Sequence, residues 1–146
     1  MKKLGKSTKK GFTLVELIVV LVILAVLAAM LVPALVGYID RAKAEKEYQT
    51  AATVYGAAQA VLTELYAKDE IGDSQTTIAS GQTLTSMPGV DAVLSLAGVS
   101  EDAVSGYSFD FDADTHIITG GTVTIGDATY TLTITDGVPS WAGALD

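Results

Sequence analysis

The chain has no cysteine and only one histidine among its 146 residues. Without cysteine no disulfide can stabilise it. Zinc sites and Ser-His-Asp triads need a constellation of side chains that His116 alone does not supply. A glycine-rich phosphate loop is missing too, because Thr119–Thr122 carries two glycines but no lysine. The sequence therefore predicts a protein that is not an enzyme.

Basic residues are scarce after Lys10. Five of the nine basic residues lie in the first ten positions, and this leader contains no acid. Residues 12–146 therefore keep four basic against 17 acidic residues, a formal side-chain charge of −13. Such a surface repels phosphate backbones, so no direct nucleic-acid binding is expected. The basic head itself favours retention of the amino terminus in the cytoplasm, by the positive-inside rule.

A long apolar run follows the basic head. Leu17–Val36 offers 20 residues without a charge, and a helix of that length spans about 30 Å, enough to cross the hydrocarbon core of a bilayer. Glu16 stands near the start of the run, where a carboxylate costs about 2.5–3.5 kcal/mol on insertion scales and usually marks a specific partner. Pro33 removes one backbone hydrogen bond and favours a kink or local unwinding.

Two ordinary interpretations of this amino terminus remain open. A secretory signal peptide also has a basic head and an apolar core, and Val26–Ala28 has the small residues of a cleavage site. Against this, Glu16 would interrupt the apolar core, and the apolar character continues to Ile39. An uncleaved membrane anchor is the other alternative.

The junction of head and run resembles the processing site of type IV pilins and of the related pseudopilins of type II secretion and competence systems. The resemblance rests on the basic leader, the apolar run with Pro33 and the segment Gly11–Glu16, which reads Gly-Phe-Thr-Leu-Val-Glu. It implies that a membrane-bound prepilin peptidase cuts between Gly11 and Phe12 and methylates the new amino terminus of Phe12. In that family the helix near such a proline can unwind on assembly, here residues about 26–37.

The resemblance also implies a partner for Glu16 and a cellular setting. Glu16 is expected to pair with the new amine of a neighbouring Phe12 in the apolar filament core, which neutralises two costly charges. Before assembly the chain is expected to cross the cytoplasmic membrane once, among lipids, with its amino terminus in the cytoplasm. After assembly it is expected in an extracellular or cell-envelope filament. The implied partners are prepilin peptidase, identical and related pilin subunits, an inner-membrane platform protein and an assembly ATPase.

Beyond Asp40 the apolar pattern becomes one-sided. Apolar residues recur at spacings of three and four, which is typical of a helix with one packed face. They are Tyr48, Ala51, Tyr55, Ala58, Leu62 and Leu65. The opposite face is charged, and Lys43 and Glu47 have the spacing of a helical ion pair. We interpret this face as solvated, with contact to a neighbouring subunit's acidic surface as the alternative.

The carboxyl-terminal third alternates between apolar and polar residues, which is typical of strands with one wet face. The predicted strands are Tyr107–Asp112, Thr122–Ile125 and Thr129–Thr135, and the predicted turns are Gly120-Gly121, Gly126-Asp127 and Asp136-Gly137. Asp69–Gly81 is interpreted as a polar loop, Val90–Ala97 as one or two helical turns, and Trp141 as a core residue.

Together these patterns predict an α+β pilin fold. A long amino-terminal helix, half membrane-spanning and half amphipathic, would pack on a small antiparallel sheet of three or four strands. Five segments follow along the chain. They are a cleaved leader (1–11), a transmembrane or filament-core helix (12–39), an amphipathic helix half (40–67), a variable loop (68–105) and the sheet with its tail (106–146).

An acidic triplet precedes His116 and raises the question of calcium. Asp110, Asp112 and Asp114 alternate along the chain, a spacing that can supply oxygen ligands, and some major pseudopilins bind calcium in a carboxyl-terminal loop. An EF-hand counted from Asp110 would need glycine and glutamate where the chain has Thr115 and Gly121. The main expectation is therefore no cofactor, with outward acids at a strand end, and calcium is the alternative.

The sequence thus predicts a structural subunit of a type IV pilus-like filament. The first alternative is a major pseudopilin of a secretion or competence system, and the second is a minor pilin or binding subunit at a filament tip. Many Gram-negative pilins close their carboxyl-terminal region with a disulfide. Its absence here favours a Gram-positive source or a pseudopilin.

Overall fold

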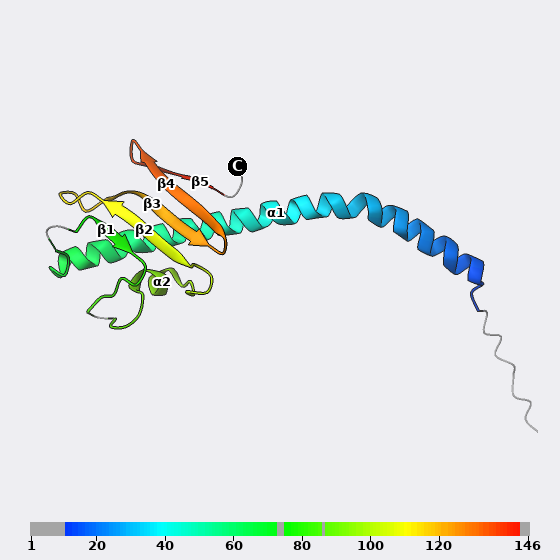
Figure 1. Ribbon diagram of the computed structural model, residues 1–146, viewed down its shortest axis with the longest axis horizontal. Coiled ribbons are helices and arrows are strands. Elements are labelled where there is room, and N and C mark those ends of the chain that lie inside the picture. The colour runs from blue at the N-terminus through cyan, green and yellow to red at the C-terminus, as the bar shows by residue number, and fades with distance from the viewer. Residues whose placement is uncertain (1–10, 73–74, 86, 144–146) are drawn as a thin grey trace, which may run out of the picture. The chain divides into compact units, whose positions relative to one another are not determined.

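A computed structural model describes residues 11–72, 75–85 and 87–143, so the leader prediction for residues 1–10 lies outside the described residues. The described elements are shown in Figure 1. In chain order they are α1 (Leu14–Ala67), β1 (Thr77–Ala79), α2 (Ala92–Ala97), β2 (Gly106–Phe111), β3 (Ile118–Ile125), β4 (Ala128–Thr135) and β5 (Val138–Ala142). The chain divides into two compact units, one up to Asp40 and the other from Arg41 onward. The predicted α+β class is confirmed.

Helix α1 is 54 residues long and continues through Pro33. The local unwinding favoured at Pro33 is therefore not present in the single chain. A proline leaves only its own position without a donor, and the hydrogen bonds of the neighbouring turns keep the segment helical. The unwinding implied for residues 26–37 on assembly is a property of the filament and stays a prediction. The helix ends after Ala67, where Asp69 takes a left-handed conformation with φ 55°.

The second unit contains one antiparallel sheet in the order β1-β2-β3-β4-β5. It has five strands where three or four were predicted. Strand β1 was missed because its three residues lie in a stretch that reads as a polar loop. Strand β5 was missed because Pro139 interrupts its pattern, although an edge strand tolerates a proline on its unpaired side.

Two of the three predicted turns are confirmed, and the third is wrong. Gly126-Asp127 joins β3 to β4, and Asp136-Gly137 joins β4 to β5. Gly120-Gly121 instead lies inside β3, with Gly121 paired to Phe109 of β2. Gly121 has φ 153°, and a Cβ atom there would stand 2.4 Å from the carbonyl oxygen of Ser108. The glycine therefore allows a close backbone approach within the sheet and marks no turn.

The core lies between one face of α1, the sheet and α2. The predicted helix face is confirmed at Ala51, Ala58, Leu62 and Leu65, which are all buried. Tyr48 is 41% exposed, and Tyr55 is half-buried. Sequence reasoning missed three buried residues of the same face, because the buried stripe is wider than the spacing that was followed. They are Val54, Ala57 and Val61.

Trp141 of β5 lies at the edge of this core, half-buried, where a core position was predicted. Its ring makes edge contacts with Tyr48 and Tyr55, with centroid distances of 6.3 and 6.4 Å. Edge-to-face pairs of this kind contribute about 0.5–1.5 kcal/mol beyond burial of area. These contacts attach β5 to the second half of α1.

Helix α2 confirms the predicted helical turns, and its cap was not foreseen. The Asp91 carboxylate caps the helix by accepting the Leu94 N–H at 3.0 Å, and Gly98 closes it with φ 67°. Asp91 is buried, and it also accepts bonds from the Gly81 N–H at 2.7 Å and the Tyr107 hydroxyl at 2.9 Å. Burial of the phenol, together with the Asp91 carboxylate, raises the pKa of Tyr107. These bonds fix the variable connection to the sheet.

Candidate assembly site

The predicted cleavage site immediately precedes helix α1. Gly11, Phe12 and Thr13 are not helical, and the helix begins at Leu14. The Phe12 side chain is 83% exposed, and every described residue from Gly11 to Lys43 is exposed as well. The Gly11–Phe12 peptide bond therefore lies in a non-helical, accessible segment of the single chain.

Glu16 and Thr13 form a reciprocal cap at the start of α1. Glu16 Oε2 accepts hydrogen bonds from the Thr13 backbone N–H at 2.9 Å and from the Thr13 hydroxyl at 3.0 Å. In return, Thr13 Oγ1 accepts the Glu16 backbone N–H at 3.2 Å. This is a capping box, which satisfies backbone donors that a helix start leaves free. The Thr-x-x-Glu spacing signals such a cap, and sequence reasoning did not use it.

The cap engages one of the two carboxylate oxygens of Glu16. Both bonds from Thr13 reach Oε2, and within the described residues no donor reaches Oε1. The carboxylate is thus held in one orientation at the amino-terminal end of the helix, where the helix dipole favours a negative charge. The structure brings Gly11, Phe12 and Glu16 together at this end, whereas Pro33 lies in the interior of α1.

The residues that follow Glu16 form an exposed apolar surface on all sides of α1. Large aliphatic side chains from Leu17 to Ile39 are each more than half exposed. Among the described residues, α1 is the one helix that is long and apolar enough to cross a membrane. Exposed apolar area on this scale needs a surrounding other than water, such as lipid or other helices.

The three aspartates considered for the calcium alternative are engaged in different ways. Asp110 lies on β2 and accepts a bond from the Thr77 hydroxyl at 3.2 Å. Asp112 Oδ1 instead accepts the N–H groups of Asp114 and Thr115 at 3.1 and 2.8 Å. The Thr115 N–H and hydroxyl, followed by the Asp114 N–H, hold the pKa of Asp112 below its usual value. Within the part of the chain that the structure describes, no group of three acidic or histidine side chains could hold a metal ion.

Four polar contacts involve the second half of α1. Three of them reach the sheet or the loop before β3, and one runs along the helix. The Tyr130 hydroxyl donates to Glu47 Oε2 at 2.6 Å. Burial of the Tyr130 ring, with this bond, raises its pKa to about 12. Glu47 also forms the predicted pair with Lys43, at 3.7 Å. The Gln59 amide accepts the Ile118 N–H at 2.8 Å and donates to the His116 carbonyl at 2.9 Å; no sequence signal marks this contact.

Comparison with known families finds one match. Residues 6–32 match the family model of the prokaryotic N-terminal methylation motif. No curated protein and no solved structure matched the chain.

The match indicates a class of protein. The methylation motif is the signature of type IV pilins and pseudopilins, and here it precedes a long helix and an antiparallel sheet. The motif covers residues 6–32 only, and it supports a type IV pilin-like or pseudopilin subunit with a structural role. It implies processing by prepilin peptidase and assembly with pilin subunits, and with the apolar helix it supports membrane anchoring before assembly.

Proposed function

We propose that the chain is the structural subunit of a type IV pilus-like filament, cleaved between Gly11 and Phe12 and methylated at Phe12. The observation that carries this proposal is the coincidence of the methylation motif with an exposed junction and an oriented Glu16 carboxylate. The matched motif covers the amino terminus only. The rest of the assignment depends on the helix and sheet that follow it.

The cap on Glu16 is compatible with the chemistry of processing. Cleavage hydrolyses the bond between the Gly11 carbonyl and the Phe12 nitrogen: one water is consumed, a carboxylate forms on Gly11, and Phe12 gains a free amine. Thr13 keeps its amide N–H, so both bonds to Oε2 can persist after cleavage. Oε1 then accepts the positively charged amine of a neighbouring Phe12 in the apolar filament core. A charged partner strengthens such a bond, and pairing removes the cost of two isolated charges.

Two features favour an abundant filament subunit over a tip protein. Glu16 is retained, so this chain can pair with identical copies above and below it. The second unit is also a small sheet domain in which short turns join β3, β4 and β5. We propose export through an inner-membrane platform protein and an assembly ATPase, from an anchored state with its amino terminus in the cytoplasm.

A pseudopilus of a secretion or competence system is the second candidate function. The motif is shared between pili and pseudopili, and the lack of cysteine favours the pseudopilus among Gram-negative sources. Neighbouring genes distinguish the two functions, because a retraction ATPase accompanies a motile pilus and a secretin with exported enzymes accompanies secretion. Electron microscopy of the cells makes the same distinction directly.

Mass spectrometry of the mature protein tests the processing step. The expected amino terminus is a methylated Phe12 in a chain that has lost residues 1–11. A mature protein that begins at Ala29 would indicate an ordinary signal peptide. An intact Met1 would indicate an uncleaved anchor. Either result would contradict the proposed function.

A further inference from the structure

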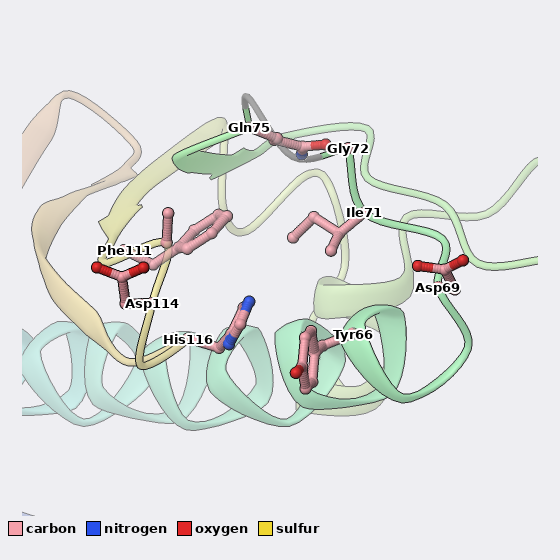
Figure 2. Close-up of a pocket in the computed structure, with 9 residues that line it drawn as sticks. Tyr66, Asp69, Ile71, Gly72, Gln75, Phe111, Asp114 and His116 are labelled. Carbon is pink, nitrogen blue, oxygen red and sulfur yellow. The ribbon is translucent and has the colours of Figure 1, made fainter.

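A small hollow lies where the end of α1 meets the loops before β1 and after β2. We call it the loop hollow, and its volume is about 280 Å³. That is slightly below the range of about 300–1,000 Å³ found for small-molecule sites, so it suits a single side chain. Its lining residues are Tyr66, Asp69, Ile71, Gly72, Gln75, Phe111, Ala113, Asp114 and His116. Figure 2 shows Asp114 and Asp69 on opposite sides of it, with the apolar and aromatic groups between them.

The lining combines aromatic rings with carboxylates. The rings of Tyr66 and His116 are stacked, with centroids 3.8 Å apart, and Tyr66 is 56% exposed. Asp114 is exposed, and its carboxylate has no partner among the described residues, since only its backbone N–H is engaged, by Asp112. No lysine or arginine lines the hollow. The described acids and histidine form no metal cluster. This chemistry therefore fits an organic cation that stacks on the rings and donates hydrogen bonds to a carboxylate.

A guanidinium group meets both requirements better than an ammonium group does. It is planar, it stacks on aromatic faces, and it donates two parallel hydrogen bonds to a carboxylate. The chain has a single arginine, Arg41, and residues 69–146 contain no lysine or arginine at all. Arg41 is exposed at the start of the second unit. The described ion pairs use Lys43 and Lys68 and leave Arg41 unpaired within the described residues.

Arg41 cannot reach the loop hollow of its own chain. Both groups belong to one continuous helix, with Tyr66 25 residues after Arg41. At 1.5 Å per residue the two positions are about 37 Å apart along the axis. Arg41 and the loop hollow are therefore complementary in charge and shape, but they lie at opposite ends of the second unit. Only another molecule can supply the guanidinium.

We propose that Arg41 of one copy inserts into the loop hollow of another copy, where it stacks on Tyr66 and pairs with Asp114. The proposal rests on the filament function above and adds a contact between the exposed domains to the pairing of Glu16. The two surfaces differ, so the contact is heterologous, and repetition of a heterologous contact generates an open helical polymer. A step of about 37 Å along the helix direction is thus specified by the positions of the two surfaces.

Charge reversal tests the contact in cells that carry prepilin peptidase and the assembly machinery. Arg41→Glu and Asp114→Arg are each expected to reduce the yield of sheared filaments at least about tenfold, since like charges then face each other. The double variant restores the pair in the opposite sense and is expected to recover most of the yield. Lys46→Glu and Asp127→Arg make the same charge changes at exposed positions away from the contact, and should assemble normally.

Cysteine cross-linking tests the geometry directly, because the chain has no cysteine of its own. Ala42 is adjacent to Arg41, and Ala113 lines the hollow. The variant with Ala42→Cys and Ala113→Cys, treated with a short bismaleimide in intact filaments, is expected to give a ladder of dimers, trimers and longer species. Each single variant should give no ladder. The variant with Ala42→Cys and Thr135→Cys is the control for random collisions between subunits, because Thr135 is exposed but does not line the hollow. It should give no ladder.

The outcomes separate this contact from the proposed function. If the wild type forms filaments and Arg41→Glu forms them at the same yield, the contact is overturned and the filament function stands. The same conclusion follows if filaments of the variant with Ala42→Cys and Ala113→Cys give no ladder. The double variant, Arg41→Glu with Asp114→Arg, should recover the filament yield. If its chain is processed and folded but the yield stays low, the result counts against pairing of Arg41 with Asp114. A wild-type chain that is never cleaved at Phe12 and forms no filaments would contradict both.

Discussion

Helix α1 is one continuous element with two different surroundings. Every residue from Leu14 to Lys43 is exposed in the single chain, although most of those before Asp40 are apolar. All eight buried residues of the helix lie at or after Ala44, and seven of them belong to the core that meets the sheet. The second half therefore completes its packing within the chain. The first half depends on partners outside the chain, first lipid and then, in the proposed filament, other helices.

The polar side chains of the two halves of α1 also have different partners. In the second half, Glu47 and Gln59 bond to the sheet and fix the domain. In the first half, Glu16 bonds only to Thr13 within the described residues, and its second carboxylate oxygen binds another molecule only in the proposed filament. Substitutions in the two halves should consequently give separate phenotypes, loss of assembly in one and loss of domain stability in the other.

The largest expected effect is loss of assembly in Glu16→Ala. Removal of the carboxylate leaves the Phe12 amine of the neighbouring copy without its partner in an apolar core, which costs several kcal/mol per subunit. Filaments should be absent or reduced by more than an order of magnitude. Electron microscopy and the sheared fraction measure this, while cleavage at Phe12 should remain largely intact.

Glu45→Ala is the matched control, because Glu45 is an exposed glutamate of the second half. It should assemble normally. In detergent, Glu16→Ala should also unfold at the wild-type temperature, as reported by the fluorescence of Trp141, the single tryptophan, which lies in the sheet. A normal filament yield from Glu16→Ala would remove the proposed role of this carboxylate.

Gly121→Ala should produce the opposite phenotype, with a destabilised domain and unchanged anchoring. Its backbone at φ 153° and the 2.4 Å approach of Ser108 leave no room for a Cβ atom. Strain and overpacking together should lower the free energy of unfolding by about 3–4 kcal/mol. Thermal unfolding followed by Trp141 fluorescence measures the loss. Gly56→Ala, on an open face of α1, should be neutral or slightly stabilising.

The same contrast explains which features the sequence could predict. The apolar run, the Gly11–Glu16 junction and the amphipathic face from Ala51 to Leu65 depend on local spacing, so they were predictable. The role of Gly121 was not, because glycine pairs also mark turns, and only the position of Phe109 on the neighbouring strand shows the close approach. Spacing likewise gave no sign of the contact between Gln59 and the loop at His116.

The capping bonds of Asp91 and Thr13 show an intermediate case. Asp91 precedes α2 by one residue, and Thr13 precedes α1 by one residue, so both occupy the usual capping position. Their local role was therefore readable from the sequence. The additional bond from Tyr107 to Asp91 joins residues 16 apart and depends on the path of the loop between them. Local chemistry predicts caps, whereas tertiary contacts need the fold.

Tyr130→Phe should destabilise the second unit moderately. It removes the 2.6 Å bond to Glu47 and leaves that carboxylate without its neutral donor, at a cost of about 1–2 kcal/mol. Tyr38→Phe, at an exposed position of the first half, should have no effect.

The pH dependence of unfolding shows whether Tyr130→Phe destabilises the domain by loss of the hydrogen bond to Glu47 or by a change in packing. The pKa of Tyr130 is raised in the folded protein to about 12, so the fold favours the protonated phenol. Its contribution is fully present below the unfolded pKa of about 10 and is lost as pH rises from there to about 12. The Phe variant should show a shallower loss of stability over this window. An unchanged alkaline slope would mean that Glu47 and Tyr130 do not interact in solution.

The smallest effect is expected from Asp112→Asn in the exposed loop after β2. Asparagine can still accept the N–H groups of Asp114 and Thr115, so this change removes only the charge. Because the pKa of Asp112 is lowered in the folded protein, its contribution is present above the unfolded value of about 3.9 and is lost as pH falls through the folded value. The variant should therefore be slightly less stable at pH 7 and less sensitive to acid than the wild type. Asp114→Asn is the control, since the Asp114 side chain accepts no bond in the described loop. A calcium-dependent rise in melting temperature that Asp112→Ala abolishes would instead support the calcium alternative.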